Sequence, residues 1–299
     1  MFAPKYYPKF HCIADKCRHS CCVGWEIDVD ERMQAVYGAL SGEIGKEIRD
    51  GIRVSEEGAC FVLRADGRCP MLDERGLCRI ISGLGEGYLC DICREHPRFY
   101  HTAGGRLEVG VGAACEEAAR LILSEDGYGD MMEIEEEENK TAPVLGDFDV
   151  LKVREALYGI LSDRTLAYGE RLVRLGSFVG GRVLTDAELV ALFSRLEYLD
   201  EAHRGLFLSF REPPTPSPES AVCAERFLAY LIYRHVSAQR DETGAVAALF
   251  AALHLERIFR YLTDVRGLSP VESAVMLSEE IEYSEENTEA FYRACGGEF

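Results

Sequence analysis

The sequence has 299 residues, of which 47% are hydrophobic and 28% charged, a composition that is ordinary for a soluble globular protein with one large or two modest domains. Its formal net charge is −19. Residues 1–125 contain 16 Lys and Arg and 20 Asp and Glu, whereas the residues after them contain 17 Lys and Arg and 32 Asp and Glu. This acidic charge disfavours nucleic acid and anionic membranes as partners. No apolar run approaches the roughly 20 residues that span a bilayer, and the N-terminus lacks the pattern of a signal peptide, so we expect a cytoplasmic location.

The first part of the chain predicts short elements. Residues 59–64 are typical of a short strand and are followed by a turn at 65–68. Residues 99–102 and 107–111 flank Gly104 and Gly105 and predict a β-hairpin, after which residues 116–123 predict a helix. Small elements of this kind bury little apolar area, so a metal centre would supply folding free energy that the core lacks.

The second part of the chain predicts helices. A charged stretch from Glu133 ends at Pro143 and predicts a solvated linker. The apolar spacing then becomes helical over 151–161 and 172–179, and Thr185 caps a helix expected to run to about Glu201. A proline-rich loop over 213–218 precedes expected helices at 219–239, 243–265, 269–281 and 284–295.

These elements predict an α+β protein that is mostly α-helical. We expect a Cys-rich, metal-chelating domain with short strands over residues 1–130. An acidic linker over 131–146 would join it to a helical domain over 147–299. No internal repeat is evident.

Cysteines are the most informative residues in the chain, because ten of the twelve lie within the first 115 positions. Disulfides are rare in the cytoplasm, and a secreted disulfide scaffold would normally be much shorter than this chain. Clustered thiolates are soft ligands that select zinc or iron–sulfur clusters. The predicted metal ligands are Cys12, Cys17, Cys21, Cys22, Cys69, Cys78, Cys90, Cys93 and Cys115.

The number of thiols leaves the kind of centre open. A tetrahedral zinc or a cubane cluster takes four ligands, so nine thiols allow two centres or one centre with further thiols beside it. Both centres accept four thiolates, so ligand type does not separate them. We interpret Cys60 as a small buried hydrophobe, and Cys223 and Cys295 as helical residues that do not bind metal.

The cysteines lie within a wider pattern of residues. It begins with Phe10, Trp25, Ile27 and Asp30 around the C-x4-C-x3-C-C run, and it continues with Asp66-Gly67-Arg68-Cys69-Pro70, Gly76-Leu77-Cys78-Arg79-Ile80, Leu89-Cys90, Cys93 and His96-Pro97-Arg98. With this pattern the sequence resembles the flagellin lysine N-methylase family, whose N-terminal half belongs to a broader class of zinc- or iron-chelating domains. The resemblance is strong over 10–115 and weak between 140 and 260, and residues 280–287 are also similar to the end of that family.

This resemblance implies an enzyme that uses S-adenosylmethionine to methylate lysine side chains of flagellin. It also implies an iron–sulfur centre and favours a [4Fe-4S] cluster over Zn²⁺. The catalytic residues stay unknown, because no methyltransferase Rossmann domain is visible in the sequence. The alternative is a non-catalytic iron–sulfur or zinc scaffold, or a metal-handling accessory protein; electron transfer is a third and less favoured possibility.

The methyl-donor site has weaker candidates. Gly110-x-Gly112-x2-Cys115 leads from a strand into a helix, and glycines there would let the backbone approach a ligand or would ease a tight turn. Arg98 is a candidate for the carboxylate of the donor.

Further polar and aromatic residues have several possible roles. His96 would ligate, orient a substrate or end a helix, and His11 and His19 are candidate hydrogen-bond donors to thiolates. Trp25 is interpreted as a core residue. The candidates to contact a lysine ammonium are Tyr6, Tyr7, Tyr88 and Tyr100.

Overall fold

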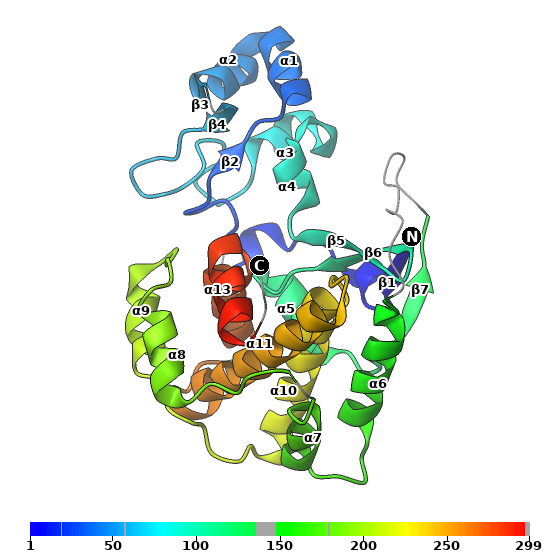
Figure 1. Cartoon of the computed structure of the whole chain (residues 1–299). Coiled ribbons are helices and arrows are strands. Elements are labelled where there is room, and N and C mark those ends of the chain that lie inside the picture. Colours follow the sequence, from blue (N-terminus) through cyan, green and yellow to red (C-terminus); the bar gives the residue numbers. More distant parts are fainter. Residues whose placement is uncertain (19, 57, 136–147, 179, 297–299) are drawn as a thin grey trace. The chain divides into compact units, whose positions relative to one another are not determined.

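A computed structural model describes residues 1–18, 20–56, 58–135, 148–178 and 180–296. Its internal contacts divide the chain into two compact units. The cysteine unit comprises His11–Arg98, and the helical unit comprises Met1–Phe10 together with Phe99–Phe299. Figure 1 shows the elements of both units.

The cysteine unit combines a small sheet with short helices. Its sheet has the order β2-β4-β3, and β4 pairs antiparallel with both neighbours. The Asp30 carboxylate caps the first helix by accepting the backbone N–H of Met33. The elements are β2 (Ile27–Asp28), α1 (Glu31–Ala39), α2 (Gly42–Asp50), β3 (Ile52–Ser55), β4 (Gly58–Phe61), α3 (Arg79–Leu84) and α4 (Asp91–Glu95), with the short 3₁₀ helices η2 (Ala14–Lys16) and η3 (Glu86–Tyr88).

The helical unit begins with a sheet of order β5-β6-β1-β7. The N-terminal strand, β1, pairs parallel with β6 and antiparallel with β7, so the first residues of the chain lie between two other strands. The turn at Gly104 and Gly105 has positive φ at both residues, as a tight hairpin requires. The elements are β1 (Phe2–Pro4), η1 (Tyr7–Lys9), β5 (Arg98–Ala103), β6 (Arg106–Val111), α5 (Glu116–Ser124) and β7 (Met131–Glu133).

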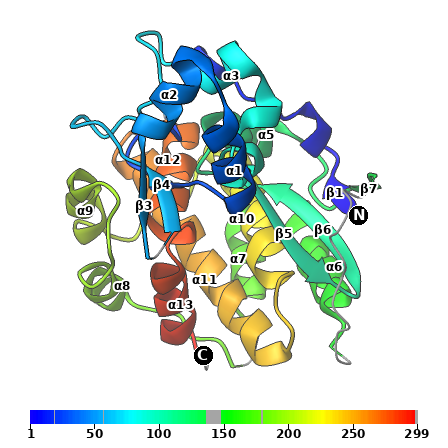
Figure 2. The ribbon, with the colours of Figure 1, turned by 90° about the horizontal axis from the view of Figure 1, so that it is seen from above.

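Long helices form the rest of this unit. Figures 1 and 2 both place α8 and α9 on one side of the group α10, α11 and α13, and α6 on the other. Three of the helices continue directly into π-helical turns within the described chain. The elements are α6 (Val150–Ser162), α7 (Tyr168–Leu175), α8 (Asp186–Phe193), α9 (Glu201–Leu208), α10 (Pro218–Leu231), η4 (Ile232–Val236), α11 (Glu242–Arg260), η5 (Tyr261–Val265), α12 (Pro270–Leu277), η6 (Ser278–Glu282) and α13 (Glu285–Ala294).

The expected mixture of helix and short strands is confirmed, and the late helices lie close to their expected bounds. The hairpin and α5, which we placed with the cysteines, belong to the helical unit. Part of the expected linker is strand β7, because Met131–Glu133 supply pairing partners for β1. Residues 136–146 of that linker lie outside the described residues.

The helix expected from Thr185 to about Glu201 was predicted too long. Thr185 does cap it, together with Glu188, but α8 ends at Phe193. The backbone N–H groups of Leu199 and Asp200 donate to the buried carboxylate of Glu280, so they cannot donate to carbonyls of the same helix. A new helix, α9, then begins after Asp200. In the part of the chain that is described, no helix is long and apolar enough to cross a membrane.

Candidate functional site

Segments far apart in the sequence bring thiols together in the cysteine unit. The backbone N–H of Cys69 donates to the carbonyl of Cys22 at 2.8 Å, next to an antiparallel bridge between Val23 and Arg68. A second bridge joins Leu72 to Cys78. Paired backbones place Cys22, Cys69 and Cys78 in one part of the unit.

Helix α4 contributes the other thiols of this cluster. Cys90 occupies the N-cap position of the helix, and Cys93 lies in its first turn, so the two side chains face each other at a spacing of three residues. Burial raises the pKa of Cys69 and of Cys78, and charge on Cys22 and Cys90 raises both further, so these thiols lie near one another. We call Cys22, Cys69, Cys78, Cys90 and Cys93 the thiol cluster.

Burial and mutual hydrogen bonding set the protonation of this thiol cluster. A hydrogen bond from Cys21 lowers the pKa of Cys22 to about 7, whereas burial raises the pKa of Cys69 to about 12. A hydrogen bond between Cys90 and Cys93 lowers the pKa of the first thiol and raises that of the second. Burial and the neighbouring thiolates therefore oppose ionisation of all five thiols at once.

The remaining predicted ligands are not members of the thiol cluster, although Cys21 forms a hydrogen bond with Cys22. Cys12 and Cys21 are exposed and Cys17 is half-buried, all on the N-terminal segment of the cysteine unit. Cys115 belongs to the helical unit, where it is the N-cap residue of α5. Among the described residues, no group of three or more His, Cys, Asp or Glu side chains is arranged so that it could hold a metal ion.

Other residues that we singled out have structural surroundings. His96 ends α4 at its C-cap position, and burial lowers its pKa to about 4, which keeps the imidazole neutral. Arg98 donates to the carbonyl of Arg94 at 3.0 Å. Trp25 and Cys60 are half-buried rather than core residues, and His19 lies outside the described residues.

Gly110 and Gly112, the glycines suggested for the methyl-donor site, lie where β6 ends and the chain turns into α5. A Cβ atom on Gly112 would lie 2.5 Å from the hydroxyl of Tyr283 and 2.7 Å from a guanidinium nitrogen of Arg234. One on Gly110 would lie 2.4 Å from the ring of Phe99. Glycine therefore allows these side chains to pack directly against the backbone of the turn.

A buried charged network lies against this turn. The backbone N–H of Ala113 donates to the hydroxyl of Tyr230 at 3.0 Å, and that hydroxyl donates to the carboxylate of Glu282. Arg234 donates to the same hydroxyl at 2.9 Å, and its Nε lies 3.4 Å from the Glu282 carboxylate. Its guanidinium stacks between the rings of Phe99 and Tyr283, each 4.9 Å away.

Glu282 is the charged centre of the network. Burial by itself raises its pKa, but the charge of Arg234 and a 2.6 Å hydrogen bond with His235 outweigh burial and lower the pKa to about 2. Arg234 and His235 lie in the π turn η4, and Glu282 lies in η6. Helical π turns often occur at functional sites. The sequence signalled this site only through the family-like block at 280–287.

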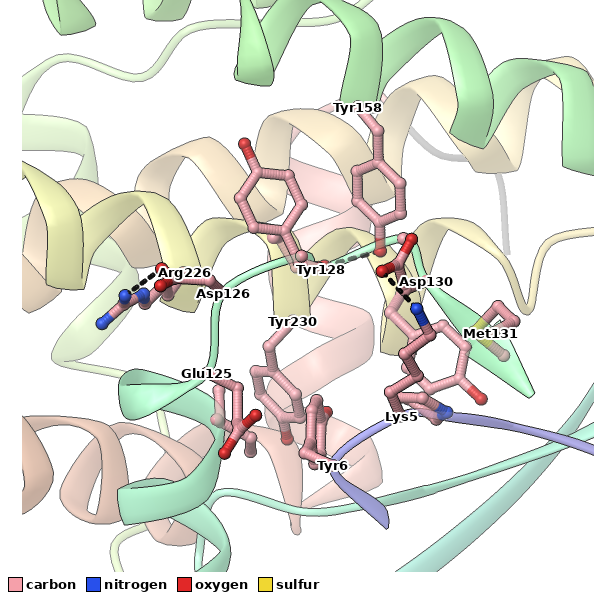
Figure 3. Close-up of a pocket in the computed structure, with 16 residues that line it drawn as sticks. Lys5, Tyr6, Glu125, Asp126, Tyr128, Asp130, Met131, Tyr158, Arg226 and Tyr230 are labelled. Atoms are coloured by element: carbon pink, nitrogen blue, oxygen red, sulfur yellow. Dashed lines mark hydrogen bonds and ion pairs between the residues drawn. The ribbon is translucent and has the colours of Figure 1, made fainter.

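Figure 3 shows a pocket of the helical unit near this network. Its lining includes several tyrosines, carboxylates and basic side chains, and it shares Tyr230 with the charged network. The lining tyrosines are Tyr6, Tyr128, Tyr158, Tyr230 and Tyr233. Of the tyrosines proposed to contact a lysine ammonium, Tyr6 lines this pocket, whereas Tyr7 and Tyr100 pack against the small core of the sheet and Tyr88 against the core of the cysteine unit.

Comparison with known proteins identifies relatives of the chain. It is 32% identical over 128 residues to lysine-N-methylases of Salmonella typhimurium and Salmonella choleraesuis, a match that covers 41% of this chain and 32% of each relative. The chain thus spans about a third of the length of those enzymes. It is 31% identical over 128 residues to the flagellar biosynthetic protein FliU of Salmonella muenchen, and this match covers 76% of that protein.

Neither a family model nor a solved structure matches the chain. The match to FliU covers about three quarters of that protein and 41% of this chain. The lysine-N-methylases match at the same level of identity. The chain therefore belongs to the family of FliU and these lysine-N-methylases.

Proposed function

We propose that this protein transfers methyl groups from S-adenosylmethionine to lysine side chains of flagellin, and that its thiols hold an iron–sulfur or zinc centre. The observation that carries the proposal is the similarity to proteins named lysine-N-methylase and to a flagellar biosynthetic protein. The acidic charge of the chain, −19, suits a lysine-bearing substrate.

The reaction sets requirements for the protein. A neutral lysine nitrogen forms a bond to the methyl carbon as the bond from that carbon to sulfur breaks, so the ammonium first gives its proton to a base or to water. The enzyme must align nitrogen and methyl group and exclude competing water. The turn at Gly110–Cys115 and the network of Arg234 and Glu282 are the candidates for the donor side of this site.

We assign the ligands of the proposed metal centre to the thiol cluster, whose side chains would turn towards a common ion on binding, since no described group of three or more is already arranged around one. Cys22, Cys69, Cys78 and Cys90 with Cys93 would hold the ion or cluster, which would stabilise a unit built from short elements. Arg68 lies close enough to lower the pKa of Cys22, so a positive charge already favours the thiolate form there.

The metal centre is tested by anaerobic purification. An iron–sulfur cluster absorbs near ~400 nm and is bleached by dithionite, whereas a zinc centre is colourless and releases stoichiometric zinc. Cys69→Ser and Cys90→Ser should lose most of the metal, while Cys223→Ser, in α10 of the helical unit, should retain it. Full metal content in the first two variants would contradict the assignment.

Activity is tested with purified flagellin and S-adenosylmethionine, read by intact mass. We expect flagellin to gain mass in steps of one methyl group, and peptide mapping to place the gain on lysine. A protein that holds its metal but leaves the flagellin mass unchanged would instead favour the alternative of a metal-binding scaffold.

A further inference from the structure

The pocket in Figure 3 has one wall with a backbone conformation that favours glycine. The segment 125–131 runs from the end of α5 to β7, and Gly127 and Gly129 both have positive φ, of 80° and 105°. The ring of Tyr158 packs against Gly129, where an added Cβ would lie 3.0 Å from it. The backbone N–H of Lys5 donates to the carbonyl of Asp130 at 3.1 Å, which fixes the rim.

Interactions of the aromatic side chains hold them in place around the pocket. The hydroxyl of Tyr128 donates to Glu225 at 2.8 Å, and that of Tyr158 donates to the carbonyl of Ala229 at 3.1 Å. The hydroxyl of Tyr233 donates to the carbonyl of Val109 at 3.0 Å. Because these phenols are already engaged and rigid, the rings can receive a ligand without reordering.

The size of the pocket restricts what it can bind. Its cavity measures about 30 Å³, which is room for one or two water-sized groups. A nucleoside is far larger than this space, whereas the ammonium head of a lysine is close to the size of a water molecule. The pocket therefore suits a single small polar group at the end of a chain.

Charge at the rim selects a cation. Tyr6 and Tyr158 line the pocket, and burial raises the pKa of each, so both phenols stay neutral. The carboxylate of Asp130 lies at the rim with Lys5 Nζ 2.7 Å from it, as the dashed line in Figure 3 shows. Their side chains are 64% and 56% exposed, so this ion pair is screened by water and easily exchanged.

We propose that this pocket receives the ammonium of the substrate lysine, which replaces Lys5 on the carboxylate of Asp130 and lies against Tyr6 and Tyr158. The inference rests on the proposed function, since it assigns a place to the lysine of that reaction. Exchange of one ammonium for another leaves the charge of the rim unchanged, so the chain's own Lys5 acts as a competitor of the substrate.

Two opposite charge changes test this inference in the full-length protein. The probe is Nα-acetyl-lysine amide, titrated by NMR, with Nα-acetyl-norleucine amide as the uncharged analogue. Lys5→Met should tighten binding of the lysine probe by about threefold because the competitor is gone, and Asp130→Asn should weaken it by about threefold. The norleucine probe should bind neither variant differently from the unmodified protein.

A matched control separates local competition from a change in net charge. Lys46 forms a similar pair with Asp50 at 2.6 Å, with side chains 74% and 62% exposed, but it lies on α2 of the cysteine unit. Lys46→Met should leave the affinity for the lysine probe unchanged. If Lys5→Met also leaves it unchanged, or weakens it, the inference is wrong even where Asp130→Asn has an effect.

The aromatic contact has its own variants. Tyr6→Phe should preserve affinity for the lysine probe, and Tyr6→Leu should reduce it by about two- to fivefold because a cation–π contact is lost. Equal affinity in both variants would show that the ring of Tyr6 does not contact the bound ammonium. These titrations need no methyl transfer, so they are independent of the activity assay. If the protein methylates flagellin but its variants do not change lysine binding as expected, the assignment of the pocket is wrong and the proposed function stands. If lysine binding changes as expected but flagellin is not methylated, the proposed reaction is wrong.

Discussion

At the scale of single residues, the turn between β6 and α5 shows why a glycine pattern has more than one meaning. Gly110-x-Gly112 has the spacing of a nucleotide-binding loop, yet the space beside each glycine holds Phe99, Tyr233, Tyr283 or Arg234. Absence of a Cβ lets buried side chains approach the turn, which is a packing reason for glycine that holds with or without a bound donor.

The packing role predicts the effect of a single methyl group. Gly112→Ala should destabilise the helical unit by about 1–3 kcal/mol, because Tyr283 and Arg234 are held by stacking and hydrogen bonds and cannot move away freely. Denaturant unfolding followed by circular dichroism measures the change.

An exposed helical glycine gives the matched control for this variant. A Cβ on Gly159, within α6, would meet no atom within 4 Å, so Gly159→Ala should stabilise the unit by about 0.5–1 kcal/mol. If both variants change stability in the same direction, the packing account of Gly112 is wrong.

At the scale of elements, the sequence predicted more of the helices than of the site that they form. The expected spans 219–239 and 243–265 cover α10 with η4 and α11 with η5, so helix start and stop signals predicted where these helices lie but not the π turns that end them. A π turn adds a residue per turn without changing composition, so periodicity could not show it. Arg234 of η4 and Glu282 of η6 lie 3.4 Å apart in one buried site.

Likewise, the sequence predicted some neighbours within the thiol cluster and not others. The spacing of Cys90 and Cys93 predicts neighbouring side chains on one helical turn, and both belong to the thiol cluster. The approach of Cys69 to Cys22 depends on a bridge between chain segments more than 40 residues apart, which local spacing does not encode. Short helices such as α1 and α2 were missed, although Asp30 offered a capping signal.

The charged network predicts how stability depends on pH. The pKa of Glu282 is about 2 in the folded protein, below the value of about 4.3 in an unfolded chain, so its contribution is fully present above pH 4.3. It is lost as the pH falls towards 2, and it amounts to roughly 3 kcal/mol. Glu282→Gln should flatten this part of the pH profile and destabilise the protein by about 3–5 kcal/mol near neutral pH.

Measurement of unfolding free energy between pH 2 and 7 checks both effects. Part of the acid sensitivity should remain in Glu282→Gln, because Arg154 and His101 also lower the pKa of the buried Glu108 to about 2. Glu289 forms an exposed ion pair with Arg293 on α13, so Glu289→Gln should change neither the profile nor the stability at neutral pH. An unchanged profile in Glu282→Gln would show that the network is not ionised as described.

At the scale of the whole molecule, the units differ in what stabilises them. The helical unit has a continuous core of aromatic and aliphatic side chains drawn from α5 to α13. The core of the cysteine unit is smaller and includes Cys69 and Cys90 themselves. Since ligand candidates are part of that core, metal binding and folding should be coupled in this unit and independent in the other.

This difference predicts a local response to metal removal. Hydrogen exchange should accelerate by at least about tenfold in α1 and α2 when the metal-loaded protein is stripped by chelation, because the loss of ligation makes opening of the cysteine unit easier by more than about 1.4 kcal/mol. Exchange in α10 and α11 should stay unchanged, since their protection comes from apolar packing. Restoring the metal should reverse the effect in the first pair of helices, whereas equal acceleration in all four would mean that the units do not fold separately.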